Sequence, residues 1–492
     1  MAEDNEPLPI VNGVVSNFAI ELKLLLPPLL FLSSLVALFR FFPSSARNLT
    51  ACTSFPPPSS AVDLLTTTAS PPPAANDKLQ HTVVEGGVIK RNFNCYGSAA
   101  YSFILMSAYR GGGDTFAVIG LSSKPLHLFS NPTYLCQWIP HNTTEIHQNI
   151  TVAGHKIFPD WGYGRVYTVV VVNCTFPFPV GHDGTGGRLL IHITATGSGD
   201  SNLNLTDTFE ALTESPGSLN TSRFDSPPKY EYLYCGSPLY GNLSPQRIRE
   251  WVAYHVNFFG RSSHFVLHDA GGVHREVMKV LRPWIEKGFV TLHDVKDEER
   301  FDGYYHNQFL IVNDCLHRYR FMTRWMFFFD VDEFIFVPNK TPIKTVTDSL
   351  SEFTQFTIQQ RTMSNKLCYQ DDNAGKAYTR LWTEFDERTR PPLNLYHNLF
   401  FVQAMGDREV GVHLSRDLKG KTTHKTYEKM MYYHYHGTIS ERSEPCVRLV
   451  NTTGLNLNGT PYVMDTSMRE VARAVKRFEL RSIGPVLQKT HQ

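Results

Sequence analysis

The run at residues 325–336, with the sequence WMFFFDVDEFIF, constrains the fold of this 492-residue chain more than any other segment. Its aromatic first half predicts a strand that is buried on both faces. Two carboxylates, Asp330 and Asp332, follow directly. Because ionised groups are costly among apolar side chains, carboxylates in this position favour a divalent metal ion as their countercharge. The alternative is an acidic pair that caps a neighbouring helix.

Strands and helices alternate from residue 230 onward. We expect strands at 230–235, 264–268, 290–293 and 325–329, and helices at 245–257, 274–287 and 304–319. This succession predicts an α/β domain with a parallel sheet, in which ligands bind beyond the carboxyl ends of the strands. Asp330, Asp332 and Asp269 lie at such ends. The chain has no Gly-x-Gly-x-x-Gly and no Walker loop, which argues against dinucleotide and ATP enzymes.

The region 81–226 has a different pattern. Short β-branched runs separated by Gly, Asn and Pro turns predict an all-β sandwich. Its aromatic residues Trp138, Trp161 and Tyr163 have two interpretations. They form a sugar-stacking face, as in carbohydrate-binding modules, or they pack the core, which we slightly favour.

The N-terminal segments predict a membrane anchor. Residues 1–23 read as a cytosolic tail, 24–42 as an apolar signal anchor and 43–80 as a Pro/Ser-rich extended stem. A cleaved signal sequence or an ordinary core helix is the alternative for 24–42.

The Asn-x-Ser/Thr sequons, from Asn48 onward, all follow the apolar run, and the 8 cysteines are scattered without a Cys-x-x-Cys. Both observations favour a glycosylated, disulfide-bonded lumenal body, and hence a type II membrane protein. The net charge of +1 gives no indication of a nucleic-acid partner.

The C-terminal half resembles glycosyltransferase family 92, and within it the plant β-1,4-galactan synthases. The resemblance covers roughly residues 230–440 and combines several segments. The stem and the all-β region also match these synthases, in which an accessory sugar-binding module precedes the transferase domain. The resembling segments are 232–240 (YLYCGSPLY), His306-Asn307-Gln308, Asn313-Asp314-Cys315-Leu316, 325–334 and His434-Tyr435-His436-Gly437.

The resemblance implies an inverting transferase of the GT-A fold over residues 227–492. It implies UDP-galactose as the donor, Mn²⁺ (or Mg²⁺) as the cofactor, and β-1,4-galactan side chains of pectin as the acceptor. It further implies a Golgi membrane location with the catalytic domain in the lumen, and the class suggests a homodimer.

In GT-A enzymes the Asp-x-Asp motif holds the metal ion, so the resemblance assigns Asp330 and Asp332 as ligands. A histidine about 100 residues later often adds a third ligand, and His434 and His436 both qualify. Gly437 would permit a close approach of His436, whereas the family's His-Tyr pair points to His434. Both remain open, with His413 as an outside candidate.

For the donor we expect contacts from Gly236 and Ser237 after the first strand, from Asp269 after the second, and from Gln308. Glu333 would contact sugar hydroxyls or orient its loop. A basic cluster of Arg416, Lys419, Lys421, His424 and Lys425 either clamps the diphosphate or forms a solvated loop.

The general base is sought among the acids between the metal motif and the histidine pair. We expect Glu384 or Asp386, because acids flanked by aromatic residues suit an acceptor pocket. The remaining candidates are Asp371, Asp372, Asp407 and Glu409.

Three other functions stay open at this point. One is a family 92 transferase with another donor or acceptor, for N-glycan galactosylation or pentose transfer. Another is a non-catalytic galactan-binding scaffold, which an intact Asp-x-Asp argues against. The last is a lumenal hydrolase that uses paired carboxylates.

Overall fold

The computed structural model describes residues 81–96, 102–123, 130–141, 150–158, 166–196, 204–297, 301, 305–362, 367–369, 389–390, 398–403, 420–423, 426, 429–435, 448–450, 456–457, 460–461, 463–464 and 467–489. The N-terminal tail, the expected anchor and the stem lie outside this part of the chain. Among the described residues, no helix is long and apolar enough to cross a membrane.

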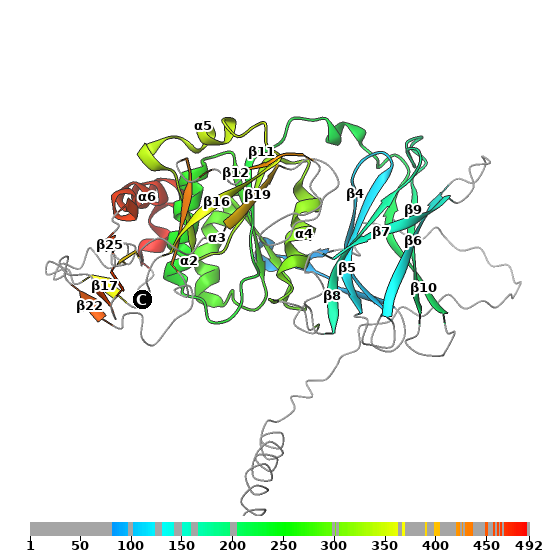
Figure 1. The fold of residues 1–492 in the computed structure, drawn as a ribbon, viewed down its shortest axis with the longest axis horizontal. Helices are drawn as coiled ribbons and strands as arrows, with labels where there is room; N and C mark the ends of the chain where they lie inside the picture. The colour runs from blue at the N-terminus through cyan, green and yellow to red at the C-terminus, as the bar shows by residue number, and fades with distance from the viewer. Residues whose placement is uncertain are drawn as a thin grey trace, which may run out of the picture. The chain divides into compact units, whose positions relative to one another are not determined.

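A parallel sheet forms the centre of the C-terminal half (Figure 1). Its strands are β11 (Tyr230–Cys235), β12 (Ser263–Asp269), β13 (Val290–Asp294) and β14 (Thr323–Phe328), in the spatial order β13-β12-β11-β14. The predicted alternation of strands and helices is therefore confirmed. Because β12 and β13 extend to one side of β11 and β14 to the other, the strand order reverses between β11 and β14. In open α/β sheets, ligands bind at this switch point.

The side chains of β11 alternate between two covered faces. The ring of Tyr234 lies 4.7 Å from that of Trp251 on helix α2 (Pro245–Phe259). On the other face, Cys235 forms a disulfide with Cys315 of helix α4 (Gln308–Tyr319). Helix α2 begins as the sequence predicts, with Ser244 as its N-cap and a proline in the first turn.

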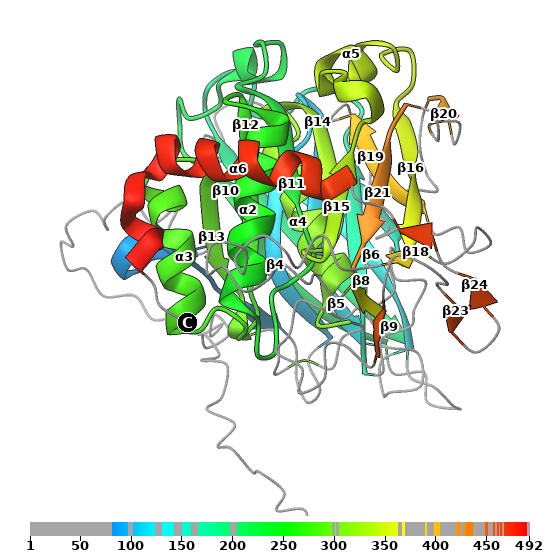
Figure 2. The same ribbon diagram turned by 90° about the vertical axis from the view of Figure 1, so that its left-hand side faces the viewer.

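Helices α3 (Arg275–Glu286) and α6 (Ser467–Ile483) share the face of the sheet that α2 covers, and Figure 2 shows α6 crossing α2. A buried ion pair joins α6 to α2, since Arg249 donates hydrogen bonds of 2.8 and 2.7 Å to Glu479. The same guanidinium donates to the Leu487 carbonyl at 2.9 Å. The amphipathic C-terminal segment thus packs on the transferase half of its own chain.

The sheet continues beyond the parallel strands on both sides. On one side follow β19 (Asn398–Gln403), β16 (Gln355–Thr362), β21 (Met431–His434) and β15 (Glu333–Phe336). On the other side β2 (Ile89–Arg91) pairs with β13, and β1 (His81–Val83) pairs with β2. Residues 81–91, which the sequence pattern groups with the all-β region, therefore supply an edge of the larger sheet.

Residues 94–214 form the predicted all-β region, an antiparallel sheet in the order β10-β9-β6-β7-β8-β5-β4-β3. Its two halves face each other across one core, and the Cys136–Cys174 disulfide connects β6 to β8. The strands are β3 (Asn94–Tyr96), β4 (Phe103–Arg110), β5 (Thr115–Ser123), β6 (Ser130–Pro140), β7 (Ile150–Ile157), β8 (Tyr167–Thr175), β9 (Gly187–Thr196) and β10 (Asn204–Glu214).

Trp138 lies inside this core. Its side chain is 2% exposed and stacks on Phe116 with ring centroids 5.4 Å apart. A ring enclosed in this way presents no face to a sugar, so Trp138 is a packing residue and not a sugar-binding one. Trp161 and Tyr163 lie outside the described residues.

Helix α4 packs on both sheets (Figure 1). It contacts β11 and β14 on one side and β4, β5 and β8 on the other. All of its residues from Gln308 to His317 are buried, as expected for a helix enclosed on every side. The sequence predicts a start at residue 304, but Tyr305, His306 and Asn307 have φ values of 49°, 53° and 57°. Because these left-handed residues cannot continue into a right-handed helix, α4 begins at Gln308.

The remaining elements are short. They are α5 (Ile343–Asp348), η1 (Glu85–Gly87), η2 (Thr221–Phe224), η4 (Pro338–Lys340), η6 (Gly484–Lys489), β20 (Thr422–Thr423) and the pairs β17 (Leu367–Tyr369) with β22 (Arg448–Val450), β18 (Thr389–Arg390) with β25 (Val463–Met464), and β23 (Asn456–Leu457) with β24 (Thr460–Pro461).

Candidate active site

The acidic motif leaves the sheet at the carboxyl end of β14, where the backbone is fixed by the neighbouring strand. The Tyr234 hydroxyl donates a 2.8 Å hydrogen bond to the carbonyl of Phe329, immediately before Asp330. The Tyr234 ring occupies the space where a side chain of Gly236 would lie, so only glycine fits there. Gly236 therefore contributes by permitting this packing at the switch point.

Asp330 is held by two residues of the expected donor site, Ser237 and Gln308. Ser237 Oγ donates to Asp330 Oδ1, and Gln308 Nε2 donates to Ser237 Oγ. Gln308 Nε2 also lies 3.5 Å from Asp330 Oδ1. The loop after β11, the first residue of α4 and the acidic motif therefore meet at one point.

Glu333 stabilises the turn that carries both aspartates. Its side chain is 4% exposed, and its Oε2 accepts a 2.7 Å hydrogen bond from the backbone N–H of Asp330. Burial raises the pKa of Glu333 well above its usual range, and the charges of Asp330 and Asp332 raise it further. Of the two roles considered for Glu333, these contacts favour orientation of the loop.

His434 lies beside the motif because β21 pairs with β15 and places this residue opposite Glu333. Its Nε2 is 3.5 Å from Asp332 Oδ1, and its Nδ1 is 3.8 Å from Glu333 Oε1. Gln360 on β16 contacts Nδ1 with its Nε2 at 2.8 Å. His434 therefore faces the acidic motif with a defined ring orientation. His436 and His413 lie outside the described residues.

The donor chemistry of this cluster suits a divalent cation, since carboxylate oxygens with one imidazole nitrogen are ligands that Mn²⁺ accepts. Asp332 and His434 are as close as two ligands of one ion would be, whereas the carboxylate of Asp330 is turned towards Ser237. In the described part of the chain, no three His, Cys, Asp or Glu side chains are arranged to hold an ion. The side chains of the cluster nevertheless have the chemistry of metal ligands, and those of Asp332 and His434 are close enough to share one ion.

Asp269 shapes the turn after β12. Its Oδ1 accepts hydrogen bonds of 2.9 Å from the N–H groups of both Gly271 and Val273. Its Oδ2 lies 3.2 Å from Nζ of Lys296, a residue that the sequence analysis did not single out. These contacts support Asp269 as an organiser of the loops at the switch point.

The other expected site residues are one exposed lysine and several residues outside the described part of the chain. Lys421 has a side chain that is 71% exposed and lies 3.5 Å from Glu352, as in a solvated ion pair. The candidate bases Glu384 and Asp386 and the basic residue Lys425 lie outside the described residues.

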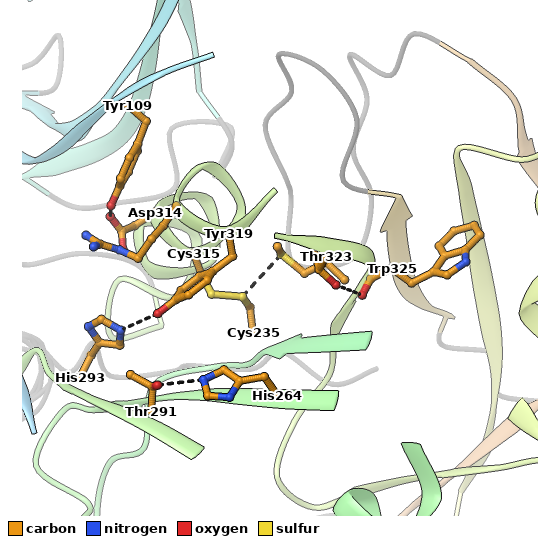
Figure 3. Close-up of a disulfide and its surroundings, with 12 residues drawn as sticks. Tyr109, Cys235, His264, Thr291, His293, Asp314, Cys315, Tyr319, Thr323 and Trp325 are labelled. Carbon is orange, nitrogen blue, oxygen red and sulfur yellow. Dashed lines mark hydrogen bonds and ion pairs between the residues drawn. A yellow bond between two sulfur atoms is a disulfide. The ribbon is translucent and has the colours of Figure 1, made fainter. Parts of the chain in front are cut away.

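Helix α4 brings Gln308 to the site and is fixed further along its length. Asp314 accepts hydrogen bonds from Arg91 at 2.9 Å and from Ser107 and Tyr109 at 2.6 Å each. Figure 3 shows Tyr109 reaching Asp314 next to the Cys235–Cys315 disulfide. Ser107 and Tyr109 belong to β4, so the all-β region takes part in placing the helix that carries Gln308.

The fold and the site together define an α/β enzyme with an acidic ligand site at the carboxyl ends of its parallel strands. Residues 230–461 match the profile described as Glycosyltransferase family 92. With the full-length relatives below, this match shows that the chain belongs to glycosyltransferase family 92.

Three relatives from Arabidopsis thaliana are similar over most of the chain. Galactan beta-1,4-galactosyltransferase GALS3 is 52% identical, and the match covers 98% of this chain and 97% of that protein. Galactan beta-1,4-galactosyltransferase GALS2 is 55% identical over 82% of this chain and 78% of that protein. Galactan beta-1,4-galactosyltransferase GALS1 is 47% identical over 80% of this chain and 79% of that protein.

Proposed function

We propose that this glycosyltransferase moves galactose from UDP-galactose to the non-reducing end of β-1,4-galactan side chains of pectin, with inversion at the anomeric carbon. The observation that carries the proposal is the 52% identity to a galactan beta-1,4-galactosyltransferase over 98% of the chain. A similarity that includes the all-β region and the acidic motif favours the same reaction over another specificity within the family.

The proposed domain is of the GT-A type. The parallel order β13-β12-β11-β14, with Asp-x-Asp directly after β14, supports this assignment. The diphosphate would lie at the switch point, between the loop of Ser237 and the turn of Asp330 and Asp332.

In this proposal Asp332 and His434 would hold Mn²⁺, or Mg²⁺, and Asp330 would join them directly or through water. Such an ion neutralises the charge that develops on the departing UDP. Gln308 and Ser237 position Asp330, and Glu333 keeps the turn in place through the N–H of Asp330. A general base takes the proton of the acceptor hydroxyl, and Glu384 and Asp386 remain its candidates.

We also propose a Golgi membrane location with residues 24–42 as the anchor, and a homodimer as the assembly. The sequons and the disulfides Cys136–Cys174 and Cys235–Cys315 support an oxidising, lumenal environment.

In the test, the purified protein is incubated with Mn²⁺, β-1,4-galactotetraose and a panel of UDP-sugars, and the mass of the acceptor is measured over time. The proposal predicts stepwise hexose additions from UDP-galactose alone, lost on chelation and restored by Mn²⁺. Transfer from a different donor would contradict the specificity. Galactan binding without transfer from any donor would favour a scaffold.

A further inference from the structure

An aromatic pair, Tyr240 and His306, lies next to the acidic motif. The rings of Tyr240 and His306 stack with centroids 3.9 Å apart and planes inclined by 22°. Tyr240 is 42% exposed, and the neighbouring Tyr305 is 59% exposed. Large aromatic side chains that remain half exposed beside an acidic cluster are a feature of ligand sites.

The backbone on both sides of this pair is fixed. Leu239 N donates to the His268 carbonyl at 2.7 Å, and Ala270 N donates to the Leu239 carbonyl at 2.8 Å, so the loop of Tyr240 is bound to the end of β12. His306 is the middle one of the three consecutive left-handed residues before α4. Such conformations are unfavourable for non-glycine residues and concentrate at functional sites. The chain thus holds the His306 ring against Tyr240 despite this cost.

The pair is close to the reacting centre. Burial raises the pKa of Tyr240, and the negative charges of Asp330 and Asp332 raise it further. The two segments that carry the rings also carry Ser237 and Gln308, which contact Asp330. A ligand on this pair would therefore lie beside the metal motif.

We propose that Tyr240, supported by His306, is the stacking platform for a galactopyranose ring at the transfer site. The inference rests on the proposed function and names a specificity determinant for it. The axial 4-hydroxyl of galactose leaves the C–H groups of C3, C4 and C5 together on one face, which suits an aromatic surface. A platform beside the acidic motif fits a sugar that reacts there, belonging either to the donor or to the chain end of the acceptor.

The test compares Tyr240→Ala and Tyr240→Leu with the matched control Tyr240→Phe, which keeps the ring and loses the hydroxyl. Isothermal titration in Mn²⁺ gives the dissociation constants of UDP, of UDP-galactose and, with UDP present, of β-1,4-galactotetraose. Loss of the ring should weaken the binding of one galactose-bearing ligand by about tenfold, which is in the range of aromatic stacking, and should leave the binding of UDP unchanged. The Tyr240→Phe variant should bind each ligand with a dissociation constant within about twofold of that of the native protein.

The ligand that weakens identifies the source of the sugar. If the variants bind galactotetraose more weakly, the platform holds the acceptor. If they bind UDP-galactose more weakly but UDP equally well, the platform holds the galactose of the donor. Equal weakening of UDP and UDP-galactose would overturn the proposal, because the platform would then hold the base. Unchanged binding of all three would also overturn it. If the native protein binds galactotetraose but transfers nothing, the proposed function fails while the platform is still tested.

Discussion

The Tyr109 phenol donates a 2.6 Å hydrogen bond to Asp314, and this bond joins strand β4 of the all-β region to helix α4 of the transferase half. Arg91 and Ser107 donate to the same carboxylate oxygen, and the Arg91 and Asp314 side chains are buried. In α4, Asp314 lies less than two helical turns from Gln308, which contacts the acidic motif. The all-β region therefore acts as a structural support for the active site.

Replacing Asp314 should destabilise the protein strongly. Asp314→Ala leaves the Arg91 charge buried without its partner, which typically lowers the free energy of unfolding by about 3–5 kcal/mol. Tyr109→Phe removes one hydrogen bond to a charged group and should lower it by about 1.5–3 kcal/mol. Urea unfolding of both variants measures the difference. Equal, small effects of less than about 0.5 kcal/mol would show that the network does not hold the two regions together.

The transferase half should not fold without the all-β region. A fragment of residues 227–492 lacks β2, and it exposes the side of α4 that β4, β5 and β8 cover, including the buried Asp314. We expect an aggregated product, whereas a chain that begins at residue 81 should be soluble. Size-exclusion chromatography and thermal unfolding compare the two. A monodisperse fragment with cooperative unfolding and intact UDP binding would instead make the all-β region an independent module.

Gln360 should control metal binding through His434. A residue that holds the second nitrogen of a ligating imidazole typically changes metal affinity about 10–100-fold when it is removed. Gln360→Leu should therefore weaken Mn²⁺ binding within this range. Gln360→Glu should retain most of it, because its carboxylate can accept from Nδ1–H and leave Nε2 of His434 free as a ligand. The measurement is a Mn²⁺ titration followed by electron paramagnetic resonance. Native affinity in Gln360→Leu would separate His434 from the metal site.

Buried histidines should make the fold sensitive to acid. Burial lowers the pKa of His255 to about 3 and the pKa values of His264 and His268 to about 4. In the unfolded chain these groups bind protons below about pH 6.5. The stability that their neutral forms contribute is therefore complete above pH 6.5 and is lost as the pH falls towards 4.

Within that window, each of these histidines should lower the free energy of unfolding by about 1.4 kcal/mol for every unit by which the pH falls. His264→Gln should reduce the slope by the contribution of one proton, about 1.4 kcal/mol per pH unit. Guanidinium unfolding between pH 7 and pH 4.5 measures the slopes. An identical slope in His264→Gln and the native protein would contradict the account.

The parallel sheet could be predicted because its determinants are local. Buried apolar runs, the Ser244 N-cap and the alternation of strand and helix lengths specify β11 to β14 and the helices between them. Ser237 and Asp330 each follow a parallel strand, so the rule that ligand residues gather at the carboxyl ends of such strands predicts that they lie together. Gln308 begins a helix, and it was expected at the site from the family resemblance.

The parts that could not be predicted depend on contacts distant in the sequence. The enclosure of α4 by the all-β region, and the pairing of β2 with β13, join segments about 200 residues apart. Gln360 has no motif around it and reaches His434 only because β16 and β21 are neighbours. Trp138 could be assigned to packing only once its burial was known, since core and ligand-binding aromatics look alike in a sequence.

The most direct test of the central claim is galactosyl transfer by Asp332→Asn, measured as the mass increase of β-1,4-galactotetraose with UDP-galactose and Mn²⁺. The matched control is Asp348→Asn, because Asp348 pairs with Lys344 on the surface of α5. The account predicts transfer reduced by at least about a hundredfold in Asp332→Asn, with native thermal stability, and full activity in the control. Transfer by Asp332→Asn at the native rate would contradict the assignment of this acidic cluster as the active site.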